Sequence, residues 1–271
     1  MKPLDRKALE AAQDLMWTAM ETAGRAERIK LAEKALSLSA HCADAYVYLA
    51  YDREKTKNQK IAMFEEGVKA GRRALGTSTF KEDVGAFWGL TETRPFMRAL
   101  FGLAQTLQES GRIDEALVHY KELLRLNPND NQGVRCVLIP LLISQDKTKE
   151  ALALVKKYPD DTSPEITYSL PLLLYKKHGD SEVARAAVGE AVKWNRHVLP
   201  FLLTPKLAPI KDNSDYVTMG GKDEAYEYAR YCRELWHKTP GAIDWLIEII
   251  IASYIEHNKL HISSFRDLQK I

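Results

Sequence analysis

The chain has 271 residues, with 39 lysine and arginine residues against 37 aspartate and glutamate residues, for a formal net charge of +2. A charge this close to zero creates no long-range field for nucleic acid or an anionic membrane. A hydrophobic content of 45% with 28% charged residues is ordinary for a soluble globular protein.

The N-terminal segment MKPLDRKALE is charged and no apolar stretch follows it, so we expect no secretory signal. The longest apolar runs, 137–143 and 247–255, are shorter than the about 20 residues that a membrane-spanning helix needs. Cys42, Cys136 and Cys232 form no C-x-x-C pair, which fits packing roles in a reducing compartment. The sequence therefore predicts a cytoplasmic protein without a membrane segment.

Nearly the whole chain reads as helix, because apolar residues recur every three to four positions and strand-like alternation is missing. The first two helices are expected over 4–22 and 25–39. The string CADAYVYLAY (42–51) predicts a third helix, a basic turn over 55–60 follows it, and a helix over 61–75 should end at Gly76.

The clearest pattern is a repeat unit, MRALFGLAQTLQESGRIDEALVHYKELLRLNP, over 97–128. Gly111 separates two helical stripes of apolar residues, and Pro128 ends the second stripe. The stripes consist of Leu100, Leu103, Ala104 and Leu107, then Ala116, Tyr120 and Leu123. This is the tetratricopeptide pattern, two antiparallel helices whose small residues lie where the helices cross, and such units stack into a solenoid.

Further units follow the same plan. One precedes it, where Tyr46, Leu49 and Ala50 match the positions of Leu100, Leu103 and Ala104. A fourth starts at Asn129, with Asn129 or Asp130 expected to cap its first helix and Pro140 expected to distort it.

A fifth unit opens with Ser163 as the expected N-cap, followed by Pro164 and Glu165, and predicts helices over 164–178 and 180–195. A last helix pair is expected over 222–238 and 240–258.

These elements predict an all-α, tetratricopeptide-type α-solenoid over 1–197, with an aromatic-bearing insertion near 77–93. The proline-rich stretch 198–221 reads as an irregular connector, and residues 222–271 as capping helices that hide the last apolar face. The tryptophans near turns, Trp88, Trp194 and Trp236, are expected to pack between repeats.

Several strings resemble one family closely. They are CADAYVYLAY (42–51), FWGLTETRPFMRALFGLAQTL (87–107), RLNPNDNQGVR (125–135), NRHVLPFLL (195–203) and DEAYEYARYCRELWHKTPGAIDWL (223–246). They look like a largely bacterial group of soluble tetratricopeptide proteins, itself similar to the suppression of tumorigenicity seven family. The resemblance runs from about residue 11 to 246 and implies a helical repeat fold with an interaction role. The membrane-spanning segments of the tumour-suppressor members have no counterpart in this sequence.

No motif for catalysis, phosphate binding or a cofactor occurs. The chain has no G-x-S-x-G, G-x-x-x-x-G-K-[ST] or G-x-G-x-x-G string, and Gly220-Gly221-Lys222 follows no strand. His257 and His261 could share a helix face but have no third ligand beyond Glu256. We therefore expect no metal, no cofactor and no enzymatic activity.

The inner side of the repeat helices is the better candidate site. Repeat positions that face the concave side of such solenoids, counted from Met97 and from Asn131, predict a peptide-binding groove of Arg98, Phe101, Gln105, Gln108, Glu109, Gln132 and Arg135. Arginine can grip a carboxylate and amides can pair with peptide groups. The competing interpretation pairs Arg94 and Arg98 with Glu92 or Glu122 to hold helices together.

Three functions stay open on the sequence. The leading one is a non-enzymatic adaptor or scaffold that binds a peptide or helix of another protein. The second is a hydrolase-like enzyme with a site in 77–93 or 198–221. The third is a nucleic-acid-associated regulator that uses Lys55–Lys60, Lys69, Arg72 and Arg73. A homodimer through Ile247–Ile251 is also left open.

Overall fold

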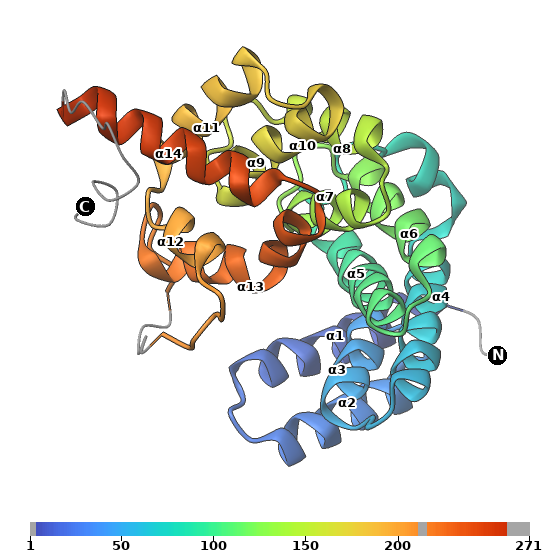
Figure 1. Ribbon diagram of the computed structural model, residues 1–271. Helices are drawn as coiled ribbons and strands as arrows, with labels where there is room; N and C mark the ends of the chain where they lie inside the picture. The colour runs from blue at the N-terminus through green and yellow to red at the C-terminus, as the bar shows by residue number, and fades with distance from the viewer. Residues whose placement is uncertain (1–3, 211–215, 259–271) are drawn as a thin grey trace. The chain divides into compact units, whose positions relative to one another are not determined.

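The computed structural model describes residues 4–210 and 216–258, and within these ranges it contains helices and no strand (Figure 1). The predicted all-α class is therefore confirmed. The chain divides into two compact units, Met1–Arg135 and Cys136–Ile271.

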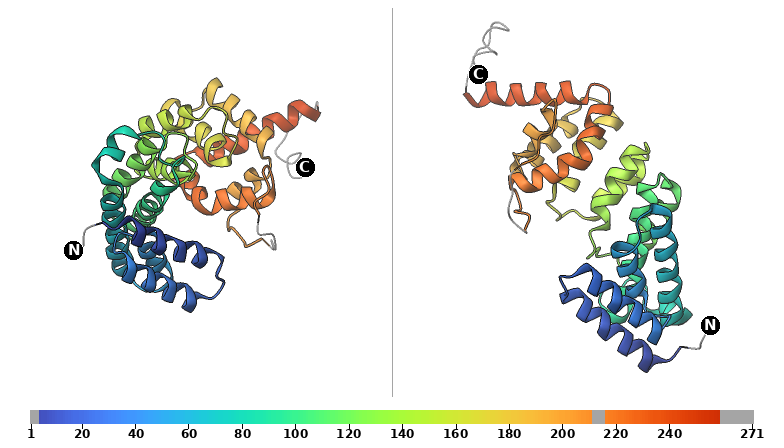
Figure 2. Two further views of the ribbon diagram at one scale, coloured as in Figure 1. Left: turned by 180° about the vertical axis from the view of Figure 1, so that it is seen from behind. Right: turned by 90° about the horizontal axis from the view of Figure 1, so that it is seen from below.

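The first unit stacks three helix pairs (Figure 1; Figure 2). Its elements are α1 (Arg6–Glu21), α2 (Arg25–Leu38), α3 (Ala43–Asp52), α4 (Lys57–Glu82), the 3-10 helix η1 (Thr91–Thr93), α5 (Arg94–Glu109) and α6 (Ile113–Leu126). Helix α1 packs on α2, α3 on α4 and α5 on α6, while α3 and α4 both pack on α5. Pairs that contact only their neighbours are the arrangement of a tetratricopeptide-type α-solenoid.

Side-chain caps begin two of the helices in this unit, α1 and α4. The Asp5 carboxylate accepts hydrogen bonds from the backbone N–H groups of Lys7 and Ala8, at 3.0 and 3.2 Å, and so begins α1. Thr56 and Gln59 form a reciprocal capping box at the start of α4. The basic turn expected over 55–60 is therefore shorter than predicted, because its last four residues already belong to α4.

The predicted break at Gly76 is confirmed, since its φ of 74° lies outside the helical region. Helix α4 resumes beyond it to Glu82, so the first residues of the predicted insertion are helical. The rest of the insertion is packed into the fold. The rings of Phe80, Phe87 and Phe96 cluster with centroids 5.0–6.3 Å apart, and the N–H groups of Gly85 and Phe87 donate to the C=O of Leu126.

The repeat core between α5 and α6 is as the pattern predicts. Ala104 and Ala116 are fully buried. The other residues of the two predicted stripes are at most 4% exposed. Small residues also set the approach of α4 to α5. A Cβ atom built on Gly102 would lie 2.3 Å from Cε1 of Phe64, whose side chain is itself fully buried. Only glycine allows the two helices to come this close.

The second unit contains α8 to α14, with α7 beginning at the boundary between the units. Its elements are α7 (Val134–Ser144), α8 (Thr148–Lys157), α9 (Pro164–Thr167), α10 (Ser169–His178), α11 (Glu182–Trp194), α12 (Val198–Leu203), α13 (Lys222–Lys238) and α14 (Ala242–Asn258). Helix α10 packs against α8 and α11, while α13 packs against α9, α12 and α14. The described part of the connector expected over 198–221 thus contains a short helix, α12, that its prolines made hard to predict.

Two expectations for the fifth unit need correction. The helix predicted over 164–178 is interrupted at Tyr168, where Pro171 has no N–H for the C=O of Thr167 and its ring crowds that carbonyl. Ser163 occupies the N-cap position of α9, but its hydroxyl forms no capping hydrogen bond. The backbone C=O of Ser163 instead accepts from the N–H groups of Ile166 and Thr167.

Buried aromatic side chains join α13 to the rest of the second unit. The Trp236 indole donates to the hydroxyl of Tyr228 at 3.1 Å, and the ring of Tyr228 lies 5.9 Å from that of Tyr168. Trp236 is fully buried, as expected, and Trp88 is half-buried. Trp194 differs from its expected packing role, because 54% of its surface is exposed.

Gly102→Ala should destabilise the protein although alanine is the better helix former. The new methyl group would overlap the Phe64 ring, so we expect the free energy of unfolding to fall by about 2 kcal/mol. Gly189→Ala is the matched control, since Gly189 lies within α11 with no atom within 4 Å of its added Cβ. That change should raise the free energy of unfolding by about 0.5–1 kcal/mol. Urea denaturation measures both, and a Gly102→Ala protein as stable as wild type would contradict the close contact.

The three thiols should react at very different rates. Burial raises the pKa of the Cys42 thiol to about 12 and also raises that of Cys232, whereas Cys136 is only partly buried. At pH 8 about one Cys42 thiol in ten thousand is the reactive thiolate. We therefore expect iodoacetamide to label Cys136 first, and the other two cysteines only after unfolding in urea. Peptide mass spectrometry gives the order, and labelling of Cys42 as fast as Cys136 would refute it.

Candidate functional site

Five of the predicted groove residues lie along α5. We refer to Arg98, Phe101, Gln105, Gln108 and Glu109 as the α5 face, because their spacing of three to four residues places them on one side of the helix. Glu109 is exposed and the other four are half-buried.

Arg98 is engaged by a buried acid. Its Nε and Nη2 donate to the two carboxylate oxygens of Asp44 on α3, at 2.8 and 2.6 Å, and the Asp44 side chain is only 1% exposed. Gln13 on α1 donates to the same carboxylate at 2.8 Å. The three residues therefore join α1, α3 and α5, the first helices of the three pairs.

The sequence also allowed Arg94 and Arg98 to hold helices together through Glu92 or Glu122, and the structure changes the partners. Arg98 does hold helices together, but through Asp44 instead of Glu92 or Glu122. Glu122 pairs with Arg125 at 2.7 Å. Arg94 uses its Nε to donate to the C=O of Trp88 at 2.9 Å, and its guanidinium lies over the Trp88 ring.

The middle of the α5 face combines a ring with amides. Phe101 meets Tyr120 edge to face, with centroids 6.1 Å apart. The Tyr120 hydroxyl donates to Oε1 of Gln108 at 2.8 Å, and burial raises the pKa of this phenol. Gln105 has no hydrogen-bond partner within the described part of the chain. The Gln105 amide is thus available to a ligand, whereas the Gln108 carbonyl already accepts from Tyr120.

The two groove residues predicted from the fourth unit lie just before and at the start of α7. Gln132 donates to the C=O of Met97 at 3.4 Å, which brings it beside α5. Asp130 accepts from the N–H groups of Val134 and Arg135, at 2.7 and 2.8 Å, so its predicted capping role is confirmed. The Arg135 guanidinium also binds this buried carboxylate, at 3.0 Å. Both predicted groove arginines are therefore neutralised by buried aspartates.

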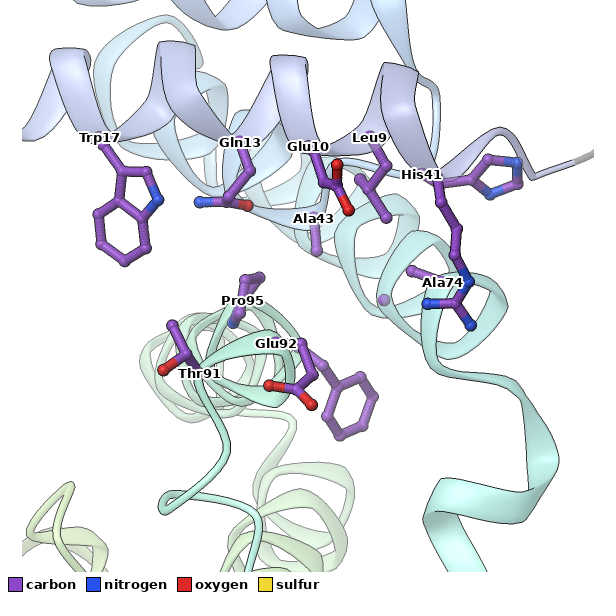
Figure 3. A pocket seen from close by; sticks show the side chains of 13 residues that line it. Leu9, Glu10, Gln13, Trp17, His41, Ala43, Ala74, Thr91, Glu92 and Pro95 are labelled. Atoms are coloured by element: carbon purple, nitrogen blue, oxygen red, sulfur yellow. The ribbon is translucent and has the colours of Figure 1, made fainter.

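A pocket of about 310 Å³ lies beside the α5 face, and sequence reasoning missed it (Figure 3). Its walls come from α1, the start of α3, α4, and the segment that includes η1 and the first turn of α5. We call it the α1–η1 pocket, and its lining residues are Arg6, Leu9, Glu10, Gln13, Trp17, His41, Ala43, Gly71, Ala74, Thr91, Glu92, Pro95 and Phe96. The signal in the sequence was the stripe Glu10, Gln13 and Trp17, which share one side of the first helix.

A second pocket, of about 390 Å³, lies in the second unit. Trp194 and the neighbouring acids Asp160 and Asp161 line it. Glu190, which also lines it, pairs with Lys193 at 2.6 Å. The exposed position of Trp194 is explained by this opening.

The basic residues considered for nucleic acid mostly have partners in the protein. Lys69 pairs with Glu66 at 2.8 Å, and the Lys57 ammonium donates to the C=O of Glu109. Arg72 lies over the rings of Phe80 and Phe96, 4.8 and 5.2 Å from their centroids. Arg73 donates to Nδ1 of His41 at 3.4 Å. Most of these cations are therefore engaged within the protein.

Two kinds of feature are absent from the described residues. None of their helices has both the length and the apolar character needed to cross a bilayer. They also contain no group of three or more histidine, cysteine or acidic side chains that could hold a metal ion. His261 lies outside the described residues, as does the side chain of His257.

Known proteins that are similar to this chain carry two descriptions, TCF25 and ST7. The family model Tcf25, described as transcriptional repressor TCF25, matches residues 88–270. Protein ST7 homolog of Drosophila melanogaster is 25% identical over 256 residues, covering 86% of this chain and 47% of that protein. Suppressor of tumorigenicity 7 protein-like of Homo sapiens is 25% identical over 264 residues, covering 89% and 46%. The resemblance inferred from the sequence strings is confirmed, and the chain spans about half the length of these curated relatives.

One similar solved structure is described as "Crystal structure of YrrB: a TPR protein with an unusual peptide-binding site". The two chains are 19% identical with a TM-score of 0.48, over 69% of this chain and 84% of that one.

Removal of the Arg98 charge should destabilise the first unit, because it leaves the buried Asp44 carboxylate without its cation. We expect Arg98→Met to lower the free energy of unfolding by about 3 kcal/mol, and addition of Asp44→Asn to recover most of that loss. Arg112→Met is the control, since the pair of Arg112 with Glu115 is exposed and its loss should leave the urea midpoint unchanged. Equal midpoints for Arg98→Met and Arg112→Met would rule out a structural role for the buried pair.

Proposed function

This chain belongs to the Tcf25 family, and on that premise we propose that it is a non-enzymatic protein-interaction module. In this proposal its tetratricopeptide-type helix pairs hold a peptide or helix of another protein against the α5 face and the adjoining residue Gln132. The observation that carries the proposal is the α5 face itself, a stripe of ring, amide and acid on the first helix of a repeat pair.

The chemistry of this face suits a polypeptide ligand. Amide side chains can donate to and accept from peptide groups at once, and Gln105 is half-buried without a partner among the described residues. The half-buried Phe101 ring offers apolar surface one turn before it. A peptide bound here would therefore find backbone hydrogen bonds and an apolar contact along one helix.

In this proposal Arg98 and Arg135 shape the groove and do not bind the ligand. A carboxylate of the partner would have to compete with Asp44 for Arg98, or with Asp130 for Arg135, and each competitor is only 1% exposed. Since an unpaired buried carboxylate is costly, a carboxylate clamp is disfavoured. We assign the two arginines to the shape of the groove and leave recognition to the remaining side chains.

Catalysis has no part in the proposal. Cys42 and Cys232 are buried, and burial raises the pKa of both thiols, the opposite of what an activated nucleophile needs. The segment 77–93, considered above for a hidden enzyme site, instead packs its aromatic rings into the fold.

A second candidate, a nucleic-acid-associated regulator, is favoured by one observation, the description of the family as a transcriptional repressor. The engagement of Lys69, Arg72 and Arg73 within the protein supports regulation through protein contacts over direct contact with phosphates. The cytoplasmic location and a homodimer through Ile247–Ile251 stay predictions; Ile247 is 39% exposed and the next three isoleucines are half-buried.

The proposal is tested by affinity capture with the tagged chain as bait, followed by mass spectrometry. We expect the variant Gln105→Ala/Glu109→Ala to keep its melting temperature and to lose a protein that the wild type enriches. The control variant Asp114→Ala/Val118→Ala changes exposed residues of α6 and should capture the same protein as the wild type. Direct titration of that protein should then show Kd raised about tenfold by the α5-face variant. Equal capture by all three baits would exclude the α5 face as the binding site.

A further inference from the structure

The α1–η1 pocket carries negative charge on two of its walls. Glu10 projects from α1 and Glu92 from η1, on opposite sides of the opening (Figure 3). Both residues are exposed, and neither forms an ion pair with any other residue that the structure describes. Some acids elsewhere in this unit have partners, such as Glu66 with Lys69 and Glu115 with Arg112. Two unpaired carboxylates at one opening favour a cation as the missing partner.

An aromatic side chain stands at the same opening. Trp17 is 40% exposed and lines the pocket from α1, without a ring contact or hydrogen bond to any described residue. Figure 3 shows Glu10, Gln13 and Trp17 extending from α1 toward the segment that carries Thr91 and Pro95. Glu10 and Trp17 are seven residues apart on one helix, so their Cα atoms lie about 10 Å apart along it.

The position of this wall is set by the buried pair. Gln13 lines the pocket and also donates to Asp44, which in turn binds Arg98 of the α5 face. Pro95 lines the pocket one turn before Arg98 on α5. The pocket and the α5 face are therefore contiguous along α5, and one bound segment can reach both.

We propose that the α1–η1 pocket recognises a basic side chain of the bound segment, lysine or arginine, placed between Glu10 and Glu92, together with an apolar side chain packed against Trp17. This inference rests on the proposed function and names the chemistry of the partner. An extended peptide advances about 3.3 Å per residue, so the distance between Glu10 and Trp17 corresponds to about three residues. The preferred ligand thus has a basic residue and an aromatic or large aliphatic residue about three positions apart.

The pocket also contains two basic residues, and they do not satisfy the acids. Arg6 lies one helical turn before Glu10, but no ion pair joins them. His41 is only 6% exposed, and its Nδ1 accepts from Arg73. Among the described lining residues, the carboxylates of Glu10 and Glu92 therefore outnumber the one exposed cation, Arg6.

The test is a selection of phage-displayed random 12-residue peptides on the immobilised full chain, run in parallel on matched variants. Glu10→Gln/Glu92→Gln removes the two charges, and Trp17→Ala removes the ring. Glu21→Gln/Glu82→Gln is the control for charge, because these exposed acids on α1 and α4 do not line the pocket. The melting temperature of each variant shows that it is folded.

On the wild type and the control we expect enrichment of a basic residue about three positions from an aromatic or aliphatic one. The Glu10→Gln/Glu92→Gln selection should lose the basic preference and keep the apolar one, and Trp17→Ala should do the reverse. For a selected peptide, fluorescence anisotropy should show Kd raised about tenfold by the loss of both acids.

Three outcomes would overturn the inference. Peptides that show no basic preference on the wild type, yet are lost on Gln105→Ala/Glu109→Ala, would refute the charge recognition and leave the proposed function standing. Absence of any enriched peptide on the wild type would refute both. An equal basic preference on the wild type and on Glu10→Gln/Glu92→Gln would place the acidic contact elsewhere.

Discussion

A carboxylate removed from water must find a cation or several hydrogen-bond donors, and Asp44 finds both. Arg98 grips both of its oxygens and Gln13 donates a further hydrogen bond, so one buried charge ties together α1, α3 and α5. These are the first helices of three successive pairs. Apolar packing alone would tolerate small shifts of one pair against the next, whereas this bidentate contact permits one register. Asp130 repeats the principle on a smaller scale, holding the first turn of α7 and the side chain of Arg135.

This constraint decides which groups remain for recognition. Arginine side chains often bind anionic groups, but Arg98 and Arg135 pair with Asp44 and Asp130 within the first unit. Their positive charge is therefore neutralised there. What stays open on the α5 face is a ring, an amide and an acid, and what stays open in the α1–η1 pocket is a tryptophan with two unpaired acids. The surface proposed to bind a ligand is therefore amide-rich and acidic, which favours a peptide with basic and apolar side chains over an acidic one.

The insertion between the second and third repeat pairs takes part in the same surface. Its aromatic rings pack into the fold, its N–H groups satisfy the end of α6, and η1 brings Glu92 to the pocket. An interruption of the repeat thus adds a wall to the proposed binding surface without breaking the stack. The chain spans about half the length of its curated relatives.

The sequence by itself determined the helical class, the repeat pairing and most helix ends. These depend on neighbours within a few residues, such as the apolar stripes of 97–128, the turn at Gly111 and the cap at Asp130. It also placed the α5 face on one side of a helix, because that follows from the helical period alone. It could not identify the partner of Arg98, which lies 54 residues away on another helix and is one of many acids in the chain.

The tertiary structure alone decided what depends on contacts between distant residues. The α1–η1 pocket draws its walls from α1, α3, α4 and η1, whose residues are far apart in sequence. The helix α12 within a proline-rich stretch likewise depends on how the chain packs on α13. Local periodicity describes which face of a helix is apolar, but the identity of the group that meets each polar side chain is a property of the assembled fold.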